Sequence, residues 1–369
     1  MPATGVTRVA VLTPQGRSAV AVVAIVGPEA EAAADAYFQP ANQRALEKQA
    51  LGRIVFGRWG GPAGEEVVVC RRAAGSVEVH CHGGIAASAA ILDALVRAGC
   101  RVVPWTDVIA ESEPDPISLA ARIAMSEAGT LRTAAILLDQ YRGALRSAFT
   151  EIDELANSTD EQLRREALRK IEILLSRASV GQHLTAPWRV AIAGQPNVGK
   201  SSLINALVGY DRAIVFEAPG TTRDVVTAQT AFDGWPVELS DTAGLRGTTD
   251  VVEAAGVARA RAQLASADLA VLVFDLSRVW TDLDRDLLAQ HPHALVIHNK
   301  CDVPHAAGAR PAGIRTSAIT GEGLVELEGA IVKRWATLAL QPGDAVPFAP
   351  EHILYLQAVQ TRLARPAFT

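Results

Sequence analysis

The sequence predicts an α/β domain with a doubly wound, mostly parallel sheet, inserted in an all-α helical domain and preceded by an α+β domain. A glycine-rich loop joins an apolar stretch to a segment of helical spacing. Three further motifs follow apolar strands, and helical periodicity flanks the whole tract. We therefore expect an α+β domain at 1–115, a helical part at 116–187, the α/β domain at 188–340 and a shortened helical part at 341–369.

The glycine-rich loop has the sequence GQPNVGKS at 194–201 and fits the phosphate-binding pattern G-x-x-x-x-G-K-[ST]. The stretch before it predicts a strand and the stretch after it a helix, so the backbone N–H groups of the loop can surround a phosphate. We expect Lys200 to reach the β- and γ-phosphates of a nucleotide and Ser201 to bind Mg²⁺. The expected nucleotide contacts in this segment are Gly194, Asn197, Val198, Gly199, Lys200, Ser201 and Ser202.

Three further motifs follow, PGTTRD at 219–224, DTAG at 241–244 and NKCD at 299–302. Motifs at the carboxyl ends of parallel strands meet at one edge of a sheet, where ligands bind. We expect Thr222 to supply a second Mg²⁺ ligand and Asp241 to hold the ion through water. The Gly244 N–H is expected to sense the γ-phosphate, which makes the segments around these motifs switches.

The NKCD motif predicts guanine recognition. The Asp302 carboxylate can accept two hydrogen bonds from the ring N–H and the exocyclic amine of guanine, and adenine has no such pair of donors. Asn299 and Lys300 complete the motif, and a fifth element adds Ser317 and Ala318. The alternative for Asp302 is a turn residue before Pro304. The pattern favours a GTPase over an ATPase.

The catalytic group is harder to identify. Many GTPases place a glutamine directly after the third motif to orient the attacking water. Here that position is Leu245, which cannot do so. The residues alone also identify no arginine finger.

The motif tracts resemble the MnmE (TrmE) family of bacterial tRNA-modification GTPases. The dense part of the resemblance spans 189–333, and weaker resemblance lies at 12–30 and 77–96. The tracts that carry it are GQPNVGKSSLINAL, IVFEAPGTTRDVV, DTAGLRGTTDVVEAAGVARA, NKCD and TSAITGEGL.

The resemblance implies a K⁺ ion beside the phosphates in place of an arginine finger, with Asn197 as one ligand. Main-chain oxygens of Phe216 and Ala218 and the Thr221 region would complete its shell. It implies that Glu253 orients the attacking water, so Glu253, Lys200 and Asn197 are the expected catalytic residues.

The resemblance also implies a homodimer, transient pairing of two GTPase domains and GTP turnover that serves modification of the wobble uridine of tRNA at C5. A flavoprotein partner, through which tRNA would be contacted, and a folate one-carbon carrier belong to that chemistry. Three features depart from the family pattern: the chain ends without the family's C-terminal cysteine, the helical return is short, and segment 106–129 differs.

Composition limits the alternatives. The chain has 369 residues, 49% hydrophobic and 20% charged, with a formal net charge of −5. This charge argues against a protein that grips nucleic acid over its whole surface. The four cysteines show no C-x-x-C pairing and are expected to be reduced thiols. No signal-peptide pattern or span-length apolar run is evident, so we expect a cytoplasmic protein without membrane contact.

Two helical predictions concern the tract before the α/β domain. Leu131, Ala135, Leu138, Tyr141 and Leu145 are spaced to form one buried helical face. Ser158 and Glu161 have the spacing of a capping box that starts a second helix. We expect the final helix to pack back on this pair.

Two other functions stay open at this point. One is a GTPase of ribosome assembly like Era or EngA, which share Asn197 and the second motif. The other is a non-catalytic module that binds nucleotide and regulates a partner.

Overall fold

The computed structural model describes residues 5–14, 18–113, 115–210, 227–241, 263–335 and 340–364. The chain divides into two compact units, residues 1–119 and 120–369. Further division of the second unit into helical and α/β domains stays a prediction. In the described part of the chain, no helix combines the length and the apolar composition that crossing a membrane requires.

The first unit contains a seven-stranded mixed sheet in the order β3-β4-β5-β6-β2-β1-β7, antiparallel except between β1 and β7. Its strands are β1 (Arg8–Val11), β2 (Val20–Val26), β3 (Phe38–Pro40), β4 (Ile54–Trp59), β5 (Glu65–Ala73), β6 (Ser76–His82) and β7 (Arg101–Val102), and its helices are α1 (Ala30–Asp35), α2 (Ile85–Arg97) and α3 (Trp105–Ala110). Alternate residues of the central strands, such as Val23 and Val79, form a core with Ile91 and Leu95 of α2. This unit agrees with the predicted α+β domain.

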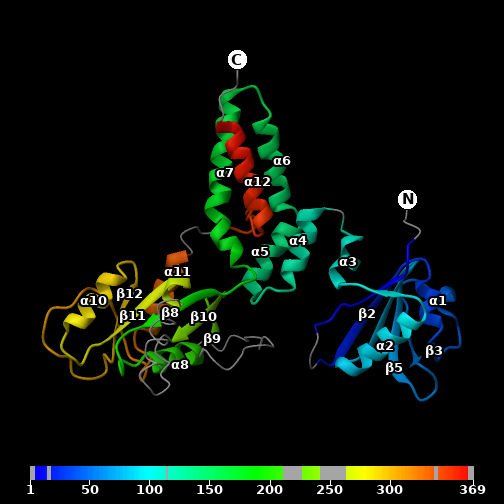
Figure 1. Ribbon diagram of the computed structural model, residues 1–369, viewed down its shortest axis with the longest axis horizontal. Coiled ribbons are helices and arrows are strands. Elements are labelled where there is room, and N and C mark those ends of the chain that lie inside the picture. Colours follow the sequence, from blue (N-terminus) through cyan, green and yellow to red (C-terminus); the bar gives the residue numbers. More distant parts are fainter. Residues whose placement is uncertain are drawn as a thin grey trace, which may run out of the picture. The chain divides into compact units, whose positions relative to one another are not determined.

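Helices dominate the next part of the chain: α4 (Pro116–Met125), α5 (Leu131–Tyr141), α6 (Ala144–Ala156) and α7 (Glu161–Gln182), with α12 (Pro350–Ala364) at the end. Figure 1 shows α6, α7 and α12 side by side, and both α6 and α12 contact α7. Ile152, Ile171 and Leu356 are fully buried. The final helix therefore packs on the second helix of the predicted pair, α7, with α6 beside it.

The predicted face of α5 is wrong. Leu131 is 90% exposed, and the buried residues of α5 are Thr133, Leu137 and Gln140. Within α5, Ala135 is exposed as well, while Leu145 is fully buried but lies in α6, beyond the turn at Gly143 with φ +107°. Two of the three buried residues, Thr133 and Gln140, are polar, so a search for apolar residues at helical spacing does not detect the buried face of α5.

The predicted capping box of α7 is also wrong. The residue at the N-cap is Asp160, whose side chain accepts a hydrogen bond from the Gln162 N–H at 2.7 Å. Ser158 lies two residues earlier and accepts from the Asp160 N–H at 3.1 Å. The nearer carboxylate takes the role because it reaches the free N–H groups of the first turn directly.

The second sheet has six strands in the order β13-β12-β11-β8-β10-β9, with only the β9–β10 pair antiparallel. Its strands are β8 (Trp188–Ala193), β9 (Thr227–Phe232), β10 (Trp235–Asp241), β11 (Leu269–Asp275), β12 (Leu295–Asn299) and β13 (Ile314–Thr316), and its described helices include α8 (Lys200–Tyr210), α10 (Asp282–Gln290) and α11 (Leu324–Trp335). Helices α8 and α11 pack on one face, and α10 packs on the other. The mostly parallel sheet confirms the predicted α/β architecture.

The segment 341–348, which leads from the α/β part of the chain to α12, is hydrogen-bonded to α5. Gln140 is fully buried; its side-chain amide donates to the Asp344 carbonyl at 3.0 Å and accepts from the Val346 N–H at 3.1 Å. Asp139 accepts from the Gly343 N–H at 2.8 Å. These bonds explain why the polar Gln140 faces inward on α5.

Candidate nucleotide-binding site

The phosphate-binding loop lies between β8 and α8, as predicted. Gly194 and Gly199 have φ values of +154° and +95°, and neither position has room for a side chain. A Cβ on Gly194 would lie 2.2 Å from the Val273 carbonyl oxygen, and one on Gly199 would lie 2.4 Å from Asn299 Nδ2. Glycine is therefore required at both ends of the loop, on conformational and on steric grounds.

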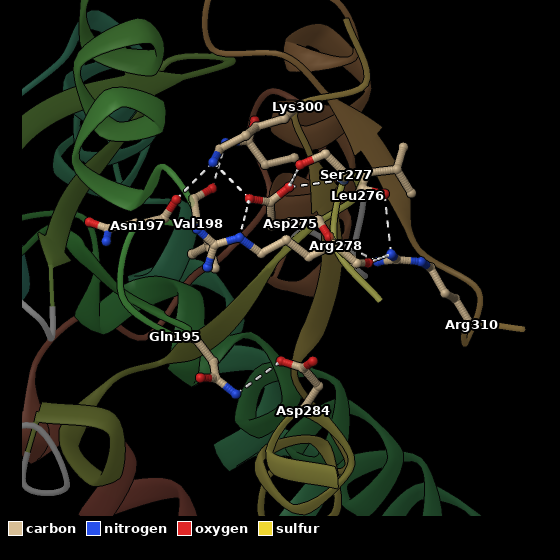
Figure 2. A network of polar contacts seen from close by, with 11 residues as sticks. Gln195, Asn197, Val198, Asp275, Leu276, Ser277, Arg278, Asp284, Lys300 and Arg310 are labelled. Carbon is tan, nitrogen blue, oxygen red and sulfur yellow. Dashed lines mark hydrogen bonds and ion pairs between the residues drawn. The ribbon is translucent and has the colours of Figure 1, made fainter. Parts of the chain in front are cut away.

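Lys200 is buried within the loop. Its ammonium donates to the carbonyls of Gly194 at 3.1 Å and Gln195 at 3.0 Å. Asn197 adopts a left-handed backbone with φ +64°, and its side chain is exposed. In Figure 2 its side-chain amide points away from Lys300, and in the described part of the chain this amide has no hydrogen-bond partner. Ser202 is exposed in the first turn of α8, and Val198 packs into the core below the loop.

The first Mg²⁺ candidates meet at this loop. The Ser201 hydroxyl donates to Asp241 Oδ2 at 2.6 Å, which joins the start of α8 to the end of β10. A hydroxyl and a carboxylate together supply the hard oxygen ligands that Mg²⁺ prefers, so these residues fit the ion. The other predicted ligands and sensors, Phe216, Ala218, Thr221, Thr222, Gly244 and Glu253, lie outside the described residues.

The predicted base-binding residues gather at the end of β12. Asn299 is buried; its amide donates to the Val198 carbonyl at 2.9 Å and accepts from the Thr316 hydroxyl at 3.2 Å. Lys300 donates to the Asn197 carbonyl at 2.8 Å. The loop and the NKCD motif are thus bonded through two consecutive carbonyls.

Asp302 is exposed, and no described residue hydrogen-bonds to its carboxylate. The fifth element lies alongside, beyond β13. Ser317 is fully buried and its hydroxyl accepts from the N–H groups of Ile319 and Thr320, while Ala318 is half-buried. The Ser317 side chain is thus used in holding this turn.

Sequence reasoning missed Asp275, the last residue of β11. Its carboxylate accepts from Lys300 Nζ at 2.7 Å and from the Ser277 hydroxyl and N–H at 2.5 Å and 2.9 Å (Figure 2). Burial opposes ionisation of this carboxyl, but the hydrogen bonds from Lys300 and Ser277 outweigh it and hold its pKa below the ordinary value. The available signal was an acidic residue closing an apolar strand, at the same sheet edge as the motifs.

The comparisons with known proteins match both units. Residues 7–104 match the family model of the GTP-binding protein TrmE N-terminus, and residues 189–300 match that of a 50S ribosome-binding GTPase. The G domain of the T. maritima FeoB iron transporter has 29% identity over 40% of this chain and 98% of its own, with a TM-score of 0.29, too low to compare the folds.

Full-length relatives extend the match over most of the chain. The tRNA modification GTPase MnmE of Synechococcus sp. (strain RCC307) is 36% identical over 367 residues, which is 89% of this chain and 80% of that protein. The Bacillus licheniformis MnmE is 32% identical over 92% of this chain and 84% of its own length. Chloroflexus aurantiacus MnmE is 36% identical over 81% and 73%. The chain therefore belongs to the MnmE (TrmE) family of GTPases, enzymes that hydrolyse GTP.

Proposed function

We propose that this GTPase requires Mg²⁺, is activated by K⁺, and acts in the modification of the tRNA wobble uridine at C5. The observation that carries the K⁺ part is Asn197. Its carboxamide is exposed on a left-handed residue of the phosphate loop and has no partner among the described residues. An amide oxygen held in this way is a suitable ligand for a hard cation beside the phosphates.

The Mg²⁺ part is supported by the contact between Ser201 and Asp241 at 2.6 Å. Bound Mg²⁺ neutralises charge on the β- and γ-phosphates during phosphoryl transfer. Thr222 is proposed as a further ligand. Lys200 is already buried in the loop and would turn its ammonium from the loop carbonyls to the phosphate oxygens.

Bound K⁺ would supply the positive charge that other GTPases take from an arginine finger. We assign its ligands to Asn197 and to main-chain oxygens of Phe216, Ala218 and the Thr221 region, by family resemblance. Glu253 is proposed to orient the attacking water, because Leu245 cannot.

Guanine selectivity is assigned to Asp302, with Gly244 sensing the γ-phosphate at the other end of the nucleotide. The exposed Asp302 carboxylate keeps its acceptor positions open, whereas Asn299 is used up in holding the loop to β13. The two Asp302 carboxylate oxygens, after the end of β12, are therefore available to accept hydrogen bonds from the ring N–H and the exocyclic amine of guanine.

Partners follow from the relatives, which are called tRNA modification GTPases. We propose a homodimer that works with a flavoprotein and contacts tRNA through it, with a folate one-carbon carrier as the donor. A second candidate, a role at the 50S ribosome, has support from the description of the family model over 189–300. The match of 7–104 to the TrmE N-terminus favours tRNA modification. Loss of the gene should remove the C5 group from wobble uridines, whereas a ribosomal role would leave this group intact.

The central experiment compares GTP hydrolysis in KCl and NaCl at equal ionic strength. We expect the parent to turn over about tenfold faster or more in KCl. Asn197→Ala should bind GDP but hydrolyse GTP equally in both salts, and Glu253→Ala should bind but lose about 10²-fold or more in rate. Asn205→Ala, an exposed asparagine of α8, is the matched control and should behave like the parent. Equal parent rates in the two salts would refute K⁺ activation.

A further inference from the structure

The segment after β11 lies against the phosphate loop and is held rigidly there (Figure 2). Leu276 donates its N–H to the Asn299 carbonyl at 2.9 Å. From the other side, the Arg310 guanidinium donates to the carbonyls of Asp275 at 3.0 Å and Leu276 at 3.1 Å, and also to that of Arg278. Hydrogen bonds to the main chain of Asp275 and of Leu276 therefore fix the position of Asp275.

The carboxylate of Asp275 is almost fully buried, with 3% of its side chain exposed. One oxygen accepts from Lys300 Nζ at 2.7 Å, with Arg278 Nε at 3.4 Å, and the other accepts two bonds from Ser277. A carboxylate can accept on both oxygens, whereas an asparagine would turn a donor toward one of these partners. The negative charge of Asp275 is therefore paired with Lys300, and both of its carboxylate oxygens accept hydrogen bonds.

Lys300 connects this carboxylate to the phosphate loop. Its backbone is left-handed at φ +68°, and its ammonium donates at once to Asp275 and to the Asn197 carbonyl. The Asn197 carbonyl belongs to the same residue whose side chain is exposed. The end of β11, the base-binding motif and the phosphate loop thus meet at a single ammonium group. Without Asp275, that ammonium, one-third exposed, could turn to solvent.

We propose that Asp275 is a positioning residue for GTP binding and turnover, which acts through Lys300 to hold the Asn197 segment of the phosphate loop. The bonds from Lys300 to Asp275 and to the Asn197 carbonyl keep the base-binding motif and the phosphate loop in a fixed relative position. The part concerning the cation rests on the K⁺ activation proposed above. The part concerning nucleotide affinity does not.

The test is a double-mutant cycle on GDP affinity with the full chain. Loss of a charge-assisted hydrogen bond predicts that Asp275→Ala weakens GDP binding about 10- to 100-fold. In a Lys300→Ala background the same change should cost no more than about threefold, because the residue through which it acts is gone. Asp286→Ala, an exposed aspartate of α10, is the control and should bind GDP like the parent. Asp275→Ala with parent affinity, or effects that multiply in the double variant, would overturn the proposal.

Two additions keep the result interpretable. Where Asp275→Ala does not fold, Asp275→Asn runs the same cycle, since it keeps the size and removes the charge. At saturating GTP, the K⁺ concentration for half-maximal rate should rise severalfold in Asp275→Ala and stay unchanged in Asp286→Ala, a shift that general loss of folded protein would not produce. If the parent shows no K⁺ effect, the proposed activation fails and the GDP cycle still decides the role of Asp275.

Discussion

Replacement of Gly199 by alanine should disable the nucleotide site through two separate costs. Gly199 has φ +95°, a backbone that costs a residue with a side chain roughly 1–2 kcal/mol. The new Cβ would also lie 2.4 Å from Asn299 Nδ2, so the amide must move. Movement breaks its bond to the Val198 carbonyl and leaves that group unpaired, at roughly 1–3 kcal/mol.

These costs sum to about 2–5 kcal/mol, divided between folding stability and nucleotide binding. Since 1.4 kcal/mol is a factor of about ten, GDP affinity should fall about 5- to 60-fold if half of the cost goes to stability. Calorimetric titration with GDP and urea unfolding of the same samples would measure the two parts. Gly209→Ala, in the α8 helix that follows the loop, is the control, because no atom outside the adjoining backbone of that helix lies within 4 Å of its added Cβ. GDP affinity unchanged in Gly199→Ala would refute the steric argument.

Two further predictions concern the helical part. Gln140→Met should destabilise the protein by about 2–4 kcal/mol, because the Val346 N–H and the Asp344 carbonyl lose their buried partner; hydrogen exchange should show lost protection at 341–348. His352 has a pKa below its ordinary value, chiefly because it is buried, and its Nδ1 accepts from the Ala349 N–H at 3.3 Å. Its contribution to stability should be complete above about pH 6.5 and be lost as the pH falls from there toward the lower folded-state pKa, which urea unfolding against pH would measure.

The controls for these predictions are exposed residues of the same kind. Gln357→Met on α12 should leave stability and exchange near the parent values, and equal losses in both glutamine variants would contradict the role of the buried amide. His352→Gln should show a weaker loss of stability on acidification than the parent, whereas His305→Gln should follow the parent curve. A parent and a His352→Gln variant with the same pH dependence would contradict the burial argument.

The placement of the glycine-rich loop, Asp241 and the NKCD motif at one sheet edge was predictable, because each is a local pattern that follows or ends a strand. A parallel sheet brings the carboxyl ends of its strands together, so Gly194, Asp241 and Asn299 had to share an edge. Apolar stretches before the motifs also predicted the strands that carry them, β8, β10 and β12. The order and spacing of the motifs along the chain were enough to predict that they lie at the same edge of the sheet.

The contacts between motifs were not predictable, because they depend on which atoms meet across the sheet edge. Asp275 lies 25 residues before Lys300, and no pattern in the sequence says that the two are bonded. The buried face of α5 was missed for a related reason. Gln140 faces inward because a distant segment supplies its partners, and Thr133 because its hydroxyl bonds to Thr130 in the capping box of α5, so polarity hid that face from a search for apolar spacing.

The strands that lead to the candidate site also make contacts at their opposite ends, where β8 and β10 begin. β8 begins at Trp188, which stacks between His183 of the α7 end and Trp335 of α11, with ring centroids 3.6 Å and 4.8 Å away. β10 begins at Trp235, beside a hairpin whose Gly234 carbonyl accepts from the Thr130 hydroxyl at 2.6 Å. The strands that carry the phosphate loop and Asp241 at one end are thus fixed to helices at the other. Strands are stiff along their length, so the spacing between Ser201 and Asp241 depends on how firmly the helical part holds both strand origins.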